Sequence, residues 1–287
     1  MTAFPPPSTA PSGWYPDPAG PGHRFFDGYR WVDTGPTFIE PEEHPVLPLR
    51  AAIGTLIVLV VSLIGGKALV DSLVRYDWPL ITYVAILAVV GYGPSLVWGL
   101  YVRRRWGARK LSSLGWSFRW SDIGWGPVTW LAAVATQIVV AVVVLVFDIP
   151  QSSNVDSAAD LDTNRAYLVA TLITAVVAAP IIEELVFRGL VLRGLLSRMG
   201  AVPAIALQGV LFGVAHVDPV RGAGNIGLAL VLSGVGVALG ASAYLFRRLG
   251  PTVIAHAIFN GVVLAIVLSG VLDDLERDLG ALLSLLV

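Results

Sequence analysis

The sequence predicts an all-α protein, a polytopic membrane bundle of about seven or eight transmembrane helices that follows a small aromatic-rich soluble domain. Of its 287 residues, 55% are hydrophobic and 14% are charged, and the mean hydropathy is +0.74. A soluble protein of this size could not keep so apolar a surface monomeric in water, so we expect the bilayer to be its solvent. Uncharged stretches of about 20 residues, the length that crosses ~30 Å of hydrocarbon, recur from residue 51 onward.

The first 50 residues divide into three predicted pieces. Residues 1–12 are rich in Pro, Ser and Thr and are expected to be disordered, and residues 36–50 are expected to form a linker. Between them, residues 13–35 place aromatic side chains among Gly, Pro and Asp, which predicts a minimal fold around an aromatic core. The aromatic residues of that core are Trp14, Tyr15, Phe25, Phe26 and Trp31.

This aromatic segment, with its opening Gly-Trp-Tyr-x-Asp-Pro, resembles a small tryptophan-containing domain of unknown function that precedes transmembrane regions in many bacterial proteins. Phe26 stands where that pattern has its first closing tryptophan. The segment is either a minimal aromatic core or a binding surface for proline-rich or extracytoplasmic partners. No charged stretch followed by an apolar core is present at the N-terminus, so no cleavable signal peptide is expected.

Seven stretches are predicted to cross the membrane, and together they form a transmembrane domain over residues 51–272. Each must be a helix because lipid cannot satisfy open backbone groups. The predicted spans are residues 51–70, 79–102, 124–147, 166–182, 199–215, 226–246 and 249–272. Residues 273–287 form an acidic and apolar tail too short to span, which leaves the count uncertain by one.

Basic residues in the short loops predict the orientation. The sequence RRRWGARK at residues 103–110 is the densest basic cluster and is expected in the cytoplasm. By alternation the N-terminus is then cytoplasmic, and the acidic segment 148–162 and the C-terminus lie outside. We therefore expect a multi-pass protein of the cell membrane.

Composition also excludes several classes of function. The net charge is −1 and no long basic run occurs, so nothing points to a nucleic-acid partner. Cysteine is absent, which excludes disulfides, thiolate nucleophiles and cysteine-based zinc sites.

Two adjacent glutamates end the apolar stretch of the fourth predicted span. A carboxylate in a transmembrane helix costs about 2.5 kcal/mol or more, so its presence suggests a role or a partner. On a helix, Glu184 and Arg188 lie four residues apart on one face and can neutralise each other, whereas Glu183 points roughly 100° away. Either both acids merely end the span at the interface, or Glu183 is a group whose proton affinity a site could tune. Pro180 supplies a possible kink just before them.

Two further polar pairs occur at helical spacing in later spans. Phe212 and His216 lie four apart in the fifth predicted span, and His256 and Asn260 lie four apart in the seventh. A lone histidine on an apolar face is more often a hydrogen-bonded core residue than a catalyst. Both intramembrane histidines nevertheless lie in helices that could face the glutamates, which predicts one wet cavity within the membrane, open to the cytoplasm.

The predicted depth of these groups carries one conflict. A hairpin turning near residue 199 would place Glu183 and His216 at the same depth, whereas His256 lies only six residues into its helix, roughly 9 Å at 1.5 Å per residue. The conflict is removed if the basic segment 188–198 projects from the membrane. The sequence therefore leaves the depth of His256 open.

Three motifs on successive membrane helices resemble those of the CAAX protease and bacteriocin-processing family of intramembrane proteases, also called CPBP or Abi. They are Glu183-Glu184-x-x-x-Arg188, Phe212-x-x-x-His216 and His256-x-x-x-Asn260. The resemblance covers about residues 160–265, and no motif position departs from the pattern. Each motif alone is weak, but the ordered triplet is specific.

The resemblance implies glutamate-dependent hydrolysis of a peptide bond inside the membrane, with a peptide or a membrane-protein segment as the substrate. By carry-over, Glu183 and His216 would activate a water molecule as general base, and His256 with Asn260 would stabilise the oxyanion. The residues expected to support the site are Glu184, Arg188 and Phe212.

The cofactor is left open, either none or zinc. Two histidines and a glutamate are a plausible zinc set, and the family has been described both as metalloproteases and as metal-independent. The donors would then be Glu183, His216 and His256. Spacing in the sequence cannot decide between the two.

Other functions fit the sequence less well. No His-Glu-x-x-His motif occurs, no aspartate lies inside a predicted span, and Ser233 lacks the preceding glycine of a rhomboid-type Gly-x-Ser-Gly. Two alternatives of other classes remain: a non-catalytic membrane scaffold or immunity protein of the same fold, and a proton-coupled transporter. An internal repeat in the sequence would favour the transporter, and none is found.

Overall fold

The protein, seen in a computed structural model, is described over residues 11–32, 47–152, 165–217 and 219–269. Expectations for residues 1–10, for most of the linker and for the tail at 273–287 lie outside these ranges. The chain divides into two compact units, Met1–Glu43 and His44–Val287, which are described separately.

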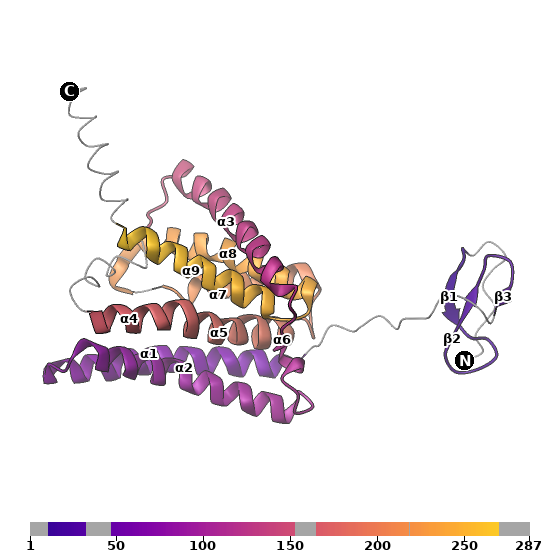
Figure 1. Ribbon diagram of the computed structural model, residues 1–287, viewed down its shortest axis with the longest axis horizontal. Helices are drawn as coiled ribbons and strands as arrows, with labels where there is room; N and C mark the ends of the chain where they lie inside the picture. The colour runs from indigo at the N-terminus through magenta and orange to yellow at the C-terminus, as the bar shows by residue number, and fades with distance from the viewer. Residues whose placement is uncertain (1–10, 33–46, 153–164, 218, 270–287) are drawn as a thin grey trace, which may run out of the picture. The chain divides into compact units, whose positions relative to one another are not determined.

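The N-terminal unit is a three-stranded antiparallel sheet in the order β1-β2-β3 (Figure 1). The strands are β1 (Gly13–Pro16), β2 (His23–Phe26) and β3 (Trp31–Val32). Tyr15, Phe26 and Trp31 meet edge to face with ring centres 5.6–6.3 Å apart, and Trp14 contacts Phe25 at 5.4 Å. The all-α prediction is therefore wrong for this unit. Successive side chains along a strand point to opposite faces of the sheet, which places the aromatic rings in these two groups.

A tight turn joins the second and third strands of the sheet. The Asp27 carboxylate accepts hydrogen bonds from the backbone N–H groups of Arg30 and Tyr29, both at 2.8 Å. These two bonds, that of Arg30 first, hold the pKa of Asp27 below its usual range because they favour the charged form. The turn thus depends on an ionised side chain.

The second unit, His44–Val287, is helical and is called the membrane unit because six helices in its described ranges are long and apolar enough to cross a membrane. Its first three long helices are α1 (Leu49–Leu73), α2 (Leu80–Arg105) and α3 (Asp122–Val146). A continuous helical segment then runs through α4 (Arg165–Ile173), η4 (Thr174–Ala178), α5 (Ala179–Glu184), η5 (Leu185–Leu192) and α6 (Arg193–Leu195). The chain continues through α7 (Ala201–Val214), η6 (Pro219–Gly224), α8 (Asn225–Phe246) and α9 (Gly250–Leu268).

Six helices of the described residues are long and apolar enough to cross a membrane. Two differences from the prediction concern the middle of the chain. The fourth span does not end at the glutamate pair but continues to Leu195, because its polar side chains are buried by neighbouring helices. The stretch predicted as a fifth span at 199–215 holds only the 14-residue α7, about 21 Å at 1.5 Å per residue, because the uncharged stretch includes loop residues at its ends.

The segment α4–α6 lies at the centre of the membrane unit. It is packed between the α1–α2 pair on one side and α9 on the other, with α7 and α8 behind (Figure 1). Small residues let α7 and α8 approach closely: a Cβ on Gly236 would lie 2.8 Å from the carbonyl oxygen of Gly209. Buried residues gather along η5, whereas α1, α2 and α3 expose many apolar side chains, as expected for helices that face lipid.

Candidate active site

Glu183 and Glu184 lie on a short α-helical stretch between two π-helical ones. Pro180 has no backbone N–H, so the helix cannot keep its ordinary ladder there, and the N–H of Ala179 bonds to the carbonyl of Thr174, five residues back. A second wide segment, η5, follows Glu184 directly. Such π-turns are frequent at functional sites because they redirect side chains by a fraction of a turn.

The wide turn before Pro180 releases one carbonyl oxygen, that of Ala175. Its α-helical donor, the N–H of Ala179, is bound to Thr174, and the donor five residues on would be Pro180. Asn260 of α9 donates its side-chain amide to this oxygen at 2.7 Å. Asn260 is therefore anchored to the helix that carries the glutamates.

Glu184 is held by two partners. Its Oε1 accepts hydrogen bonds from Arg188 Nη1 at 2.8 Å and from His256 Nδ1 at 2.9 Å. Arg188 also donates to the carbonyl oxygen of Gly236 at 3.2 Å. Because a carboxylate only accepts, the hydrogen of His256 lies on Nδ1, which leaves Nε2 directed toward Glu183. The side chains of Glu184 and Arg188 are fully buried, so the pair does not end the span at an interface.

The ring of Phe212 contacts several of the side chains at this site. The guanidinium of Arg188 lies 4.4 Å from the centre of its ring, and the rings of His216 and Phe187 lie at 4.7 and 5.1 Å. His216, just beyond α7, donates from Nδ1 to the carbonyl oxygen of Phe212 at 2.8 Å, since a carbonyl oxygen can only accept. Its Nε2 therefore also faces Glu183.

Three acceptor atoms consequently converge on one point. Oε2 of Glu183 lies 3.7 Å from Nε2 of His216 and 3.9 Å from Nε2 of His256. It is buried and has no hydrogen-bond partner among the described residues. With the histidines neutral, this arrangement suits a molecule that brings hydrogen atoms, such as water, or a cation.

The same three atoms are the candidate donors for a metal ion. No group of three or more His, Cys, Asp or Glu in the described ranges has the spacing of a metal site. The donors that an ion would use are nonetheless Glu183, His216 and His256, because each histidine donates its other ring N–H to an oxygen, as metal-binding histidines do. Oε2 of Glu183 lies 3.7 and 3.9 Å from the two Nε2 atoms, so these donors would have to move closer together to hold an ion.

A cavity of about 700 Å³ adjoins this point. Its lining includes Glu183, Phe212, His216, His256 and Asn260, and the rest is mostly apolar and comes chiefly from α1, α2, α4, η4, α8 and α9. Glu184 and Arg188 do not line the cavity, but they contact His256 and Phe212, which do. All of the residues expected from the sequence to perform chemistry therefore meet at one cavity.

Sequence reasoning missed one residue of this cavity. Tyr92 of α2 donates its hydroxyl to Oε1 of Glu183 at 3.3 Å and also lines the cavity. Its only signal in the sequence is a polar tip between Gly91 and Gly93 in an apolar span, which does not separate it from an ordinary membrane tyrosine.

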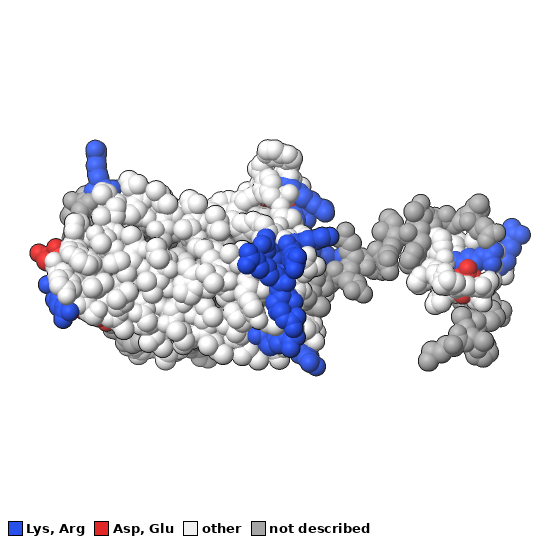
Figure 2. Space-filling view, turned by 90° about the horizontal axis from the view of Figure 1, so that it is seen from below, with Lys and Arg blue, Asp and Glu red and all other residues white. Residues whose placement is uncertain are grey.

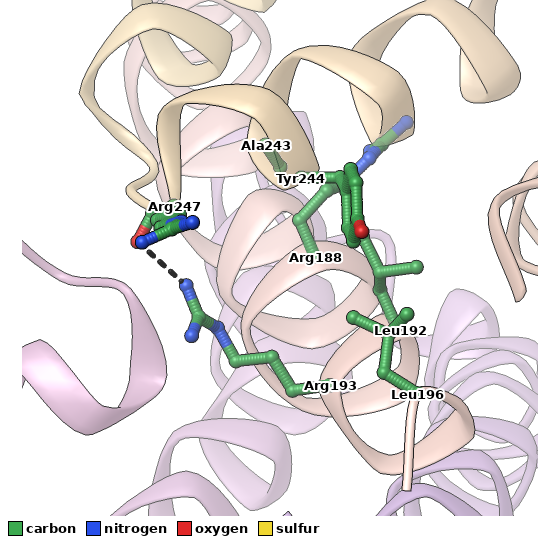
Figure 3. A pocket seen from close by; sticks show the side chains of 7 residues that line it. All are labelled: Arg188, Leu192, Arg193, Leu196, Ala243, Tyr244 and Arg247. Atoms are coloured by element: carbon green, nitrogen blue, oxygen red, sulfur yellow. Dashed lines mark hydrogen bonds between the residues drawn. The ribbon is translucent and has the colours of Figure 1, made fainter. Parts of the chain in front are cut away.

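A second, water-sized pocket of about 10 Å³ has Arg188 in its lining (Figure 3). It is lined by Arg193, Tyr244 and Arg247, and Arg193 donates to the carbonyl oxygen of Arg247 at 3.0 Å. The depth of His256 follows from its own contact: its Nδ1 lies 2.9 Å from Oε1 of Glu184, so it lies at the level of the glutamate pair.

The comparison with protein-family models matches residues 165–262 to the model described as "Type II CAAX prenyl endopeptidase Rce1-like". Residues 165–262 form an Rce1-like domain of the CPBP (Abi) family. The Rce1-like domain runs from α4 into α9 and contains all seven residues singled out from the sequence. Among curated proteins and solved structures, nothing matches the chain.

The extent of the Rce1-like domain divides the membrane unit. The helices α1, α2 and α3, with Tyr92, lie outside it. The family is one of protein-cleaving enzymes, which suggests an intramembrane protease with a protein substrate.

Proposed function

We propose that the protein is an intramembrane endopeptidase in which Glu183 activates a water molecule for attack on a peptide bond. The observation that carries this proposal is the approach of Glu183 Oε2 to the Nε2 atoms of His216 and His256 beside a cavity of peptide size. Buried acceptors that face one point in a cavity are the arrangement that general-base catalysis requires.

The proton transfers follow from which atoms already carry hydrogen. Glu183 Oε2, with Nε2 of His216 beside it, takes a proton from water as the water oxygen attacks the carbonyl carbon. The peptide carbonyl oxygen becomes an oxyanion, and the proton is then delivered to the leaving amine nitrogen as the C–N bond breaks. The products are one carboxylic acid and one amine, so the atoms of water are fully accounted for.

The oxyanion is assigned to His256 and Asn260. His256 is held at Nδ1 by Glu184, and its Nε2 faces the cavity, where it would donate to the oxyanion once that nitrogen carries a hydrogen. Asn260 has two amide hydrogens, one of which binds Ala175, so the other can serve the cavity. A metal ion at the same donors would polarise the carbonyl or the water instead.

The substrate is inferred to be an uncharged stretch of a membrane-associated protein or peptide. Among the described lining residues, Glu183 and the two histidines are the ionisable groups besides tyrosines, and no lysine or arginine is present. An acidic side chain would therefore enter the cavity without a cationic partner, at a cost on the order of several kcal/mol. A basic side chain would pair with the Glu183 carboxylate that the proposed reaction needs.

Glu183→Gln tests the proposal. General-base removal is expected to lower cleavage by about 10²–10⁴-fold. Membrane peptides from cells that express either the wild-type protein or the variant are compared by mass spectrometry, with fragments expected only from the wild type. Asp71→Asn is the matched control, because it makes the same chemical change at an exposed carboxylate and should leave all fragments in place.

The outcomes separate the alternatives. Identical fragments from Glu183→Gln and the wild type, at equal expression, would rule out the protease and favour a scaffold. Glu183-dependent proton uptake without fragments would favour a transporter. Metal analysis of the purified protein, with chelator treatment of an active preparation, decides whether an ion is used: stoichiometric zinc and activity restored by zinc would assign one.

A further inference from the structure

Tyr92 approaches the candidate site from outside the Rce1-like domain. It lies in α2, which packs against α4, α5 and η5, and its hydroxyl donates to Glu183 Oε1 at 3.3 Å across 91 residues of sequence. Its ring packs against the buried cluster that contains Phe187 and Phe212. The same side chain therefore contacts the apolar support of the site and its central carboxylate.

The two oxygens of Glu183 have different surroundings. Oε1 receives the Tyr92 hydroxyl, whereas Oε2 faces Nε2 of His216 and Nε2 of His256. The terminal torsion of a glutamate is broad and roughly two-fold, so the backbone does not by itself fix the plane of the carboxylate. A hydrogen bond to one oxygen restricts that rotation and aims the other oxygen.

We propose that Tyr92 is a positioning residue, which holds Oε1 of Glu183 so that Oε2 stays between the two histidines. This inference rests on the proposed function, because the geometry it maintains is that of the water-activating carboxylate. It also assigns α2 a part in the site: the helix supplies a contact that the matched domain lacks. Loss of the hydroxyl leaves the ring and its packing in place, so the fold should tolerate it.

The kinetic test compares Tyr92→Phe with Tyr83→Phe. Tyr83 is the matched control because it lies in the same helix but does not line the cavity. Within the described ranges, its hydroxyl bonds only to the backbone groups of Leu73 and Trp78. The substrate is a quenched fluorescent peptide spanning a cleavage site found in the comparison of the wild type with Glu183→Gln. Tyr92→Phe should lower kcat by about 10- to 100-fold, the effect of a misaligned catalytic group, with KM within about twofold. Tyr83→Phe should match the wild type.

A second measurement tests the contact without any substrate. The protein is labelled with 3-fluorotyrosine, and the Tyr92 resonance is assigned by its absence from Tyr92→Phe. In ¹⁹F NMR spectra that resonance should move in Glu183→Ala and stay in place in Asp71→Asn, while the Tyr83 resonance should move in neither.

The two measurements keep this inference separate from the proposed function. If Glu183→Gln abolishes cleavage but Tyr92→Phe keeps the kcat of Tyr83→Phe, the positioning role is overturned and the protease remains. If Glu183→Gln leaves the fragments unchanged, the protease is overturned, and the inference falls with it. A Tyr92 resonance that ignores Glu183→Ala would contradict the contact itself.

Discussion

Two ion pairs of the membrane helices have the same spacing but different surroundings. Glu184 and Arg188 lie 2.8 Å apart with fully buried side chains, whereas Lys67 and Asp71 lie 3.0 Å apart with more than half of each side chain exposed. A buried charge that loses its partner keeps its desolvation penalty, whereas an exposed one is solvated again. Residue spacing alone therefore does not predict what each pair contributes.

Glu184→Ala is expected to destabilise the protein by about 3–5 kcal/mol, because it leaves Arg188 buried without its carboxylate. It also frees His256, so cleavage should fall with stability. Asp71→Ala, the matched change in the exposed pair, should cost about 0–1 kcal/mol. Unfolding of the purified variants in mixed micelles, followed by circular dichroism as denaturing detergent is added, measures both. Equal losses of unfolding free energy in the two variants would contradict the inference that burial determines what each ion pair contributes to stability.

At the scale of helical elements, the contacts within one helix and the meeting of the motif residues at one cavity were predictable, but the particular partners across helices were not. Residues four apart on one helix share a face, and the Glu184–Arg188 and Phe212–His216 contacts follow from that spacing. The contacts of Glu184 with His256 and of Glu183 with Tyr92 depend on how separate helices pack, and no spacing encodes them. Uncharged length also overestimated α7, since hydropathy does not mark where a helix ends.

Pro180 shows a further limit of sequence reasoning. The sequence indicates a possible kink there, and the structure has a π-turn whose released carbonyl at Ala175 is bound by Asn260, 85 residues away. The residue type predicted a disturbed helix, but the form of the disturbance depends on that distant amide. Asn260 therefore has a structural contact in addition to the role expected from its motif.

A double-mutant cycle on Asn260 and Pro180 tests this link between α9 and η4. Asn260→Ala should cost about 1–3 kcal/mol in the wild-type background, because it leaves the Ala175 carbonyl without its donor. In Pro180→Ala, the new N–H restores a backbone donor for that carbonyl, either directly or by returning Ala179 to the α-helical register. The cost of Asn260→Ala should then be clearly smaller. Unfolding free energies of the four proteins give the coupling, and equal costs in both backgrounds would show that the contact is incidental.

At the scale of the membrane unit, charge is distributed unevenly. Lysine and arginine gather at one end (Figure 2), the end at which α2 finishes with Arg103, Arg104 and Arg105. The same end holds a buried ion pair between Arg248, in the turn before α9, and Asp122 of α3, with Nε and Oδ1 2.8 Å apart. The helix that carries His256, α9, begins directly after that turn. The Arg248–Asp122 pair therefore fixes the start of the helix that carries His256 and Asn260.

Labelling of single cysteines tests the proposal that the basic end faces the cytoplasm. The chain has no cysteine of its own, so Ser112→Cys at the basic end and Ser72→Cys at the opposite end need no altered background. Both serines are exposed and the two changes are chemically identical. Because basic loops are retained in the cytoplasm, an impermeant maleimide added to intact cells should label Ser72→Cys only, and both variants should react after permeabilisation. If Ser112→Cys were labelled instead and Ser72→Cys were not, the orientation of the helices in the membrane would be the reverse of the one proposed.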